Sequence, residues 1–136
     1  MTIKRFEDLE CWQEARKLVK MIYAAVKNSP EFQKDFRLVG QYTAAGVSVM
    51  NNIAEGLAAQ SNAEFVRFLR YSRRSAAETQ NCSYVTLDQE YITRTTFQEL
   101  YDQALKIYPV CPTCPIKSLL HLFHRVGELL RKIKMI

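Results

Sequence analysis

Apolar side chains recur every three or four residues along most of the chain, which is the spacing of one face of an α-helix. The first such segment extends from Leu9 to Tyr23, with charged residues on its other faces. Asp8 suits the N-cap position, and Pro30 disfavours helical backbone at the residue before it. We therefore predict an amphipathic helix that begins after Asp8 and ends at Asn28-Ser29-Pro30.

The second segment, about Asp35 to Leu57, differs because it has almost no polar face. Between Phe36 and Ala58 it contains two charged residues, Arg37 and Glu55, and the stretch from Leu38 to Ala54 contains none. Gly40 and Gly46 each cost about 1 kcal/mol of helix propensity relative to alanine, which a close helix crossing would offset. We expect this helix to be enclosed by neighbours on nearly all sides. One small bundle has too few helices for that, so we predict that the chain associates with copies of itself.

Two capping boxes, Ser61-Asn62-Ala63-Glu64 and Thr96-Phe97-Gln98-Glu99, predict the starts of a third and a fourth helix. The third extends to about Asp88. Three prolines between Pro109 and Pro115 then forbid regular helix, and an apolar pattern resumes after them. The last segment is either a short fifth helix or a broken continuation of the fourth. The pattern as a whole predicts an all-α, antiparallel up-and-down four-helix bundle with a proline-interrupted C-terminal helix.

Length and composition fit one soluble globular domain spanning residues 1–136. Hydrophobic residues make up 48% of the chain and charged residues 24%, and 4 Gly and 4 Pro leave little turn chemistry for an all-β protein. The first sixteen residues are too charged for a signal peptide, and polar residues interrupt the longest uncharged stretch. We therefore expect a cytoplasmic protein with no membrane contact.

Two groups of basic residues are candidates for contact with RNA or DNA. The formal net charge is +5, which permits such contact without requiring it. Arg67, Arg70 and Arg74 share one face of the third helix, and guanidinium groups suit phosphate. The excess of positive charge lies in the C-terminal region, so we expect an RNA contact to centre on the second group: Lys117, Arg125, Arg131, Lys132 and Lys134. The alternatives are a solvated face paired with Glu64 and Glu78 for the first group, and a loose basic tail for the second.

Four polar residues on the second and third helices are further candidates: Asn52, Glu55, Ser75 and Glu78. They either contact a nucleic acid or partner, or form an inter-helix hydrogen-bond network that sets the register. Because a buried polar group without a partner costs about 1–3 kcal/mol, we favour the network.

Cys111 and Cys114, followed by His121 and His124, are weak candidates for a zinc site. Their spacing does not fit the usual zinc finger, and the βαβ setting of a redox Cys-x-x-Cys motif is absent, so a proline-stiffened loop is the simpler interpretation. The sequence has no glycine-rich phosphate loop, no Glu-x-x-His pairs and no recognisable catalytic triad. We predict no catalysis and no cofactor.

Several stretches together resemble a known family: Phe6-Glu7-Asp8-Leu9 with Trp12, Val47 to Gly56, Glu64 to Leu69, and then Ser75 and Glu78. They are similar to the four-helix-bundle proteins of the 23S ribosomal RNA intervening-sequence family, over about residues 6–108. That family in turn resembles the accessory variability protein of diversity-generating retroelements. The resemblance implies assembly into a five-membered ring without known catalysis. In the retroelement relatives, a basic surface of the ring is used with a partner reverse transcriptase and its RNA, and the resemblance implies a similar surface here.

Overall fold

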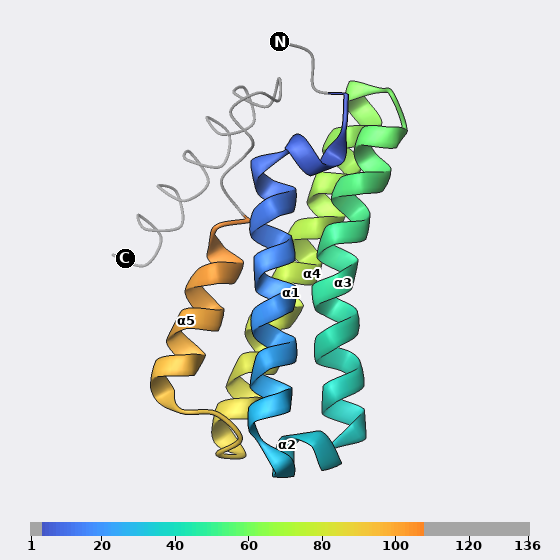
Figure 1. The fold of residues 1–136 in the computed structure, drawn as a ribbon. Helices are drawn as coiled ribbons and strands as arrows, with labels where there is room; N and C mark the ends of the chain where they lie inside the picture. The colour runs from blue at the N-terminus through green and yellow to red at the C-terminus, as the bar shows by residue number, and fades with distance from the viewer. Residues whose placement is uncertain (1–3, 108–136) are drawn as a thin grey trace, which may run out of the picture.

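The computed structural model describes residues 4–107, and these fold as helices joined by short turns. The elements are η1 (Phe6–Asp8), α1 (Glu10–Asn28), α2 (Pro30–Lys34), α3 (Phe36–Ala58), α4 (Asn62–Asp88) and α5 (Arg94–Leu105). Figure 1 shows the four longer helices side by side in alternating directions, with α5 beside α1 and with α2 at one end of the bundle. The all-α bundle is confirmed. The proline-interrupted segment lies outside the described residues.

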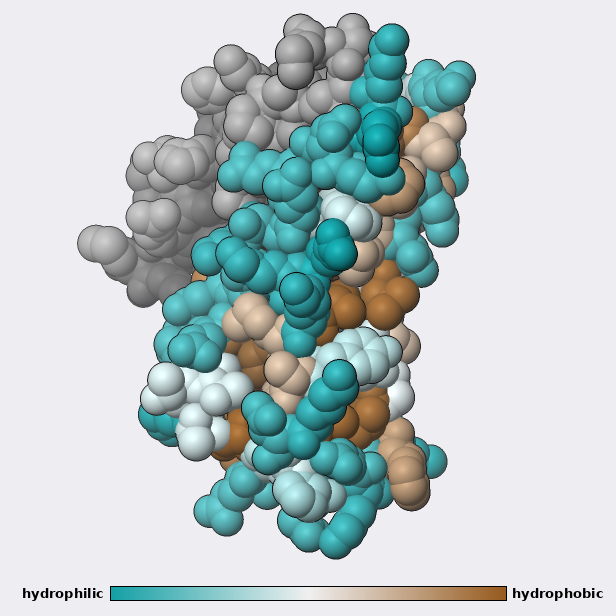
Figure 2. Space-filling view, viewed as in Figure 1, coloured by the Kyte–Doolittle hydropathy of each residue, from teal (hydrophilic) through white to brown (hydrophobic). Residues whose placement is uncertain are grey.

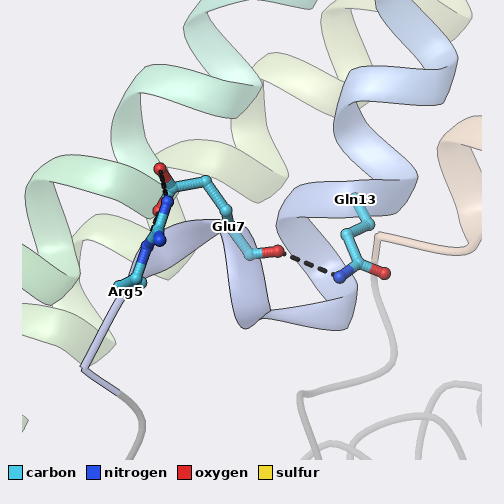
Figure 3. A network of polar contacts seen from close by, with 3 residues as sticks. All are labelled: Arg5, Glu7 and Gln13. Carbon is cyan, nitrogen blue, oxygen red and sulfur yellow. Dashed lines mark hydrogen bonds and ion pairs between the residues drawn. The ribbon is translucent and has the colours of Figure 1, made fainter.

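The chain enters α1 one residue later than predicted. Asp8 belongs to the single turn η1, and Leu9 takes the N-cap position without a side-chain capping bond. The Leu9 side chain is almost fully buried, so packing rather than a carboxylate determines where the helix begins. Figure 3 shows the polar contacts that hold this turn: Gln13 Nε2 donates to Glu7 O at 2.9 Å, and Arg5 pairs with the Glu7 carboxylate at 3.0 Å. The hydrogen bond from Arg5 lowers the pKa of Glu7.

Neither predicted capping box forms. Ser61 is the N-cap of α4 as expected, but its hydroxyl makes no capping bond, and Glu64 pairs with Arg67 instead of reaching back. Helix α5 begins three residues earlier than predicted, because Thr93 caps it by accepting from the amide of Thr96 at 3.1 Å. The predicted ends near Asp88 and after Leu57 are confirmed within a residue.

The sequence predicted only that the first helix ends near Pro30, but a short helix, α2, begins there. Ser29 accepts a hydrogen bond from the amide of Phe32 at 3.2 Å, and Pro30 occupies the first turn, where its missing donor costs nothing. The turn buries Phe32 completely, with its ring 5.2 Å from Tyr91 and 6.4 Å from Tyr42. Helix α2 therefore closes this end of the core.

Two glycines on α3 permit close packing of its neighbours. A Cβ at Gly56 would lie 2.8 Å from Phe68 Cβ and 3.5 Å from the Phe65 Cα, so only glycine lets α4 approach here. A Cβ at Gly46 would lie 2.9 Å from the end of the Ile22 side chain on α1. The small residues of this segment thus act inside a single chain, where α3 packs most extensively against α4.

Within residues 4–107 one side of α3 is left uncovered, and its enclosure by copies of the chain stays a prediction. Phe36 is 83% exposed and Val47 37% exposed, and a Cβ at Gly40 would meet nothing within 4 Å. Among residues 4–107, α1 and α4 are the helices that pack along α3, and no described element covers its third side. Figure 2 shows hydrophobic atoms exposed among hydrophilic ones where α1 and α3 face the viewer. We call Phe36, Gly40, Ala44 and Val47 the outer face of α3.

Candidate nucleic-acid interface

Four arginines and one tyrosine gather on the surface of α4. They line one shallow hollow, which we call the α4 arginine hollow: Arg67, Arg70, Tyr71, Arg73, Arg74 and Ala77. The helical spacing that places Phe65, Ser72 and Ala76 in the core turns these residues outward. The structure therefore brings together the three arginines that the sequence placed on one face, and it adds Arg73 and Tyr71 to them.

The arginines of the hollow differ in how far they are engaged. Arg67 pairs with Glu64 at 3.3 Å, and its guanidinium carbon lies 5.9 Å from the centre of the Tyr71 ring. Within the described residues, no ion pair or hydrogen bond engages Arg70 or Arg74. Glu78, one turn beyond Arg74, is exposed and forms no ion pair there either. The interpretation of a face neutralised by Glu64 and Glu78 thus accounts for one arginine.

A hydroxyl and amide network joins α3 to α4. The Ser48 and Ser75 hydroxyls lie 2.9 Å apart, and Asn52 Nδ2 donates to Ser48 O at 2.8 Å and to Ser48 Oγ at 3.1 Å. Two of the four predicted network residues, Asn52 and Ser75, therefore meet through a residue that the sequence did not single out. Glu55 and Glu78 lie outside the network because the helices turn both carboxylates to solvent.

Further along α3 and α4, buried hydroxyl groups form hydrogen bonds inside the core. Ser72 donates to Val49 O at 3.0 Å, and Ser83 donates to Thr79 O at 2.9 Å. Because Ser83 uses its only proton on that carbonyl, the Tyr42 hydroxyl donates to Ser83 Oγ. Burial raises the pKa of Tyr42 far above its usual range. The recurrence of Ser72, Thr79 and Ser83 on the core side of α4 is the sequence signal for these bonds.

The remaining candidates do not form a site in the described part of the chain. The basic residues Lys117, Arg125, Arg131, Lys132 and Lys134 lie outside the described residues, as do Cys111, Cys114, His121 and His124. Among residues 4–107, no group of three or more His, Cys, Asp and Glu side chains is placed to hold a metal ion. Cys11 and Cys82 are buried thiols, and burial raises the pKa of Cys82. None of the helices described is both long and apolar enough to span a bilayer.

Comparison with known proteins gives the family. The family model of the 23S rRNA-intervening sequence protein matches residues 7–110. A solved structure, a protein of unknown function from the S23 ribosomal protein family of Bacteroides thetaiotaomicron, is 27% identical with a TM-score of 0.63. The match covers 71% of this chain and 90% of that chain. A search of curated proteins finds no significant similarity. The resemblance to the accessory variability protein of retroelements stays a prediction, whereas the family-model match covers most of the chain and all five α-helices: the chain belongs to the 23S rRNA-intervening sequence protein family.

Proposed function

We propose that the protein is a non-catalytic homo-oligomer that binds RNA or DNA through the α4 arginine hollow. The observation that carries the proposal is the concentration of four arginines within two turns of α4, two of them without an ion pair in residues 4–107. Guanidinium groups on a solvent-facing helix are well suited to phosphate oxygens, which they bind through paired hydrogen bonds. Exposed arginines that pair with no acidic side chain among residues 4–107 are suited to an external anion.

The outer face of α3 supports the oligomer, with a second copy of the chain as its occupant. The exposed ring of Phe36 stands about one helical turn from the bare backbone of Gly40. One surface thus offers both a protruding side chain and a stretch of bare backbone, which lets it pack closely against its own copy. No charged residue between Leu38 and Ala54 would have to be desolvated at that contact. The family resemblance suggests a five-membered ring as the closed form of this assembly.

The more specific form of the proposal is an accessory subunit that assists a retroelement reverse transcriptase and its RNA. A second candidate is a structural interaction scaffold, or a ribosomal RNA intervening-sequence product, without a defined nucleic-acid role. The charge balance of the described part favours this second candidate, since residues 4–107 carry 14 basic and 13 acidic side chains. The excess of positive charge lies beyond residue 107.

Salt dependence separates the two candidates. We expect the affinity for RNA and DNA oligonucleotides, measured by fluorescence anisotropy, to fall steeply as ionic strength rises, because bound lysines and arginines release counterions. Exchanging Arg70 and Arg74 for glutamate should lower the log–log salt slope by up to about 1.5 and weaken binding. The matched control exchanges Lys17 and Lys20 on α1, which are equally exposed.

The same measurement locates the contact surface. If the α1 control weakens binding as much as the α4 variant, net charge alone is responsible and the hollow is not the site. A third variant reverses Arg131, Lys132 and Lys134, which tests the C-terminal group. Wild-type protein that binds no oligonucleotide even at low salt would leave the scaffold as the better account.

A further inference from the structure

Tyr71 lies among the arginines of the hollow, and its position there indicates what kind of nucleic acid fits. The side chain is 37% exposed, and its ring stands edge-on to Phe68 at a centroid distance of 6.0 Å and an interplanar angle of 87°. The other large exposed aromatics of the described residues are Tyr23, Phe36 and Tyr84, and none of them lines the hollow.

We propose that the α4 arginine hollow binds single-stranded nucleic acid, with an unpaired base stacked on Tyr71 and the flanking phosphates on Arg70 and Arg74. This rests on the proposed function and adds the class of ligand to it. Every base has a π-face, so stacking on an aromatic ring contributes affinity without requiring a particular sequence. Arginine beside the ring stacks on bases as well as pairing with phosphate.

The arrangement discriminates against duplexes for a geometric reason. Arg70 and Arg74 lie one helical turn apart, about 6 Å along the axis, with Tyr71 between them. A single strand is able to place a base on the ring while its backbone follows the two arginines. In a duplex the bases are stacked on one another, and the deep major groove of double-stranded RNA excludes side chains. A duplex therefore presents phosphates alone, and Tyr71 adds nothing to its binding.

The test compares one oligonucleotide sequence as a single strand and as a duplex, in RNA and in DNA, at fixed salt. Because one stacked base is worth about 1–3 kcal/mol, exchanging Tyr71 for alanine should weaken single-strand binding roughly 5- to 150-fold. Duplex binding should change less than about 2-fold. Tyr71→Leu keeps an apolar contact with Phe68 but lacks a π-face. It should therefore lose the preference for single strands over duplexes, even if the alanine variant is unstable. Tyr71→Phe and Tyr71→Trp should retain it.

Tyr84→Ala is the matched control, since Tyr84 is 51% exposed on the same helix and lies outside the hollow. It should leave both affinities unchanged. If Tyr71→Leu folds and binds single strands as tightly as wild type, or if single strand and duplex lose affinity equally, the proposal is wrong while arginine-dependent binding stands. Absence of all nucleic-acid binding by wild type would refute the proposed function itself.

Discussion

Exchange of Gly40 for alanine should have opposite effects on the isolated chain and on its assembly. In the single chain a Cβ at this position meets no atom within 4 Å, so the new methyl group causes no clash. It removes the conformational freedom that glycine has in the unfolded chain, which stabilises an exposed helix interior by about 1 kcal/mol. At concentrations where the monomer dominates, Gly40→Ala should therefore raise the free energy of unfolding in urea by about 1 kcal/mol.

In the proposed assembly the same methyl group would stand on the bare backbone that the neighbouring copy contacts. Overpacking of a close contact costs about 1–3 kcal/mol, which corresponds to a dissociation constant roughly 5- to 150-fold larger for each contact. Sedimentation velocity over a concentration series measures this change directly. We expect the variant to remain monomeric at concentrations where wild type associates.

Gly56→Ala is the control that separates the two effects. Its Cβ would lie 2.8 Å from Phe68 Cβ, an atom that is fixed to the α4 backbone, so α4 has to move away. We expect a net loss of about 1 kcal/mol or more in stability, since overpacking outweighs the gain in helix propensity. If Gly40→Ala stabilises the chain and leaves association unchanged, the outer face of α3 is not the interface. If the wild-type protein is monomeric throughout, the self-association argument fails altogether.

Two further exchanges test how the helices are held together. Burial raises the pKa of Tyr42, so the folded chain keeps the phenolic proton above about pH 10, where the unfolded chain releases it. Stability should fall as pH rises from that point by up to about 1.4 kcal/mol per pH unit, and urea unfolding of Tyr42→Phe between pH 9 and 11 should lack this component. Gln103 donates to the Glu14 carboxylate at 2.6 Å and to the Glu14 carbonyl at 3.0 Å, which ties α5 to α1. Gln103→Ala should cost about 1–3 kcal/mol and speed hydrogen exchange in α5, and unchanged exchange there would show that apolar packing alone holds this helix.

The spacing of apolar residues predicted the long helices well because burial of one face dominates their stability. It could not locate their ends, which depend on a few backbone bonds. The chain leaves α4 through Glu90, whose φ of 59° closes a bond from the Tyr91 amide to Thr86 O at 3.1 Å. This C-terminal turn usually contains glycine, and a glutamate there gives no signal in the sequence. Thr93 and Thr96 both suit an N-cap. Because the chain already turns at Glu90, α5 begins early and Thr93 caps it.

The candidate site was predictable only in part. Helical spacing placed Arg67, Arg70 and Arg74 on one face, because that follows from their positions along the helix alone. Spacing does not reveal which carboxylate an arginine pairs with, and Glu64 rather than Glu78 takes that role. Nor does it show that Tyr71 stays exposed, since an aromatic residue close to Phe68 on an amphipathic helix is equally consistent with the core.

The two surfaces on which the proposed function depends lie on different helices and share no residue. The outer face of α3 includes Gly40 and Val47, whereas the arginine hollow belongs entirely to α4. The residues that join copies through α3 are therefore not the residues that line the hollow. One hollow offers a single ring and two guanidinium groups that no described residue engages, which is too little for tight binding at physiological salt. Repetition of the hollow around an assembly turns later contacts along one strand into intramolecular ones, which raises affinity by about 10²–10⁴ without any new contact. Self-association would then be the condition for binding a long strand, and not merely a means of covering exposed apolar side chains.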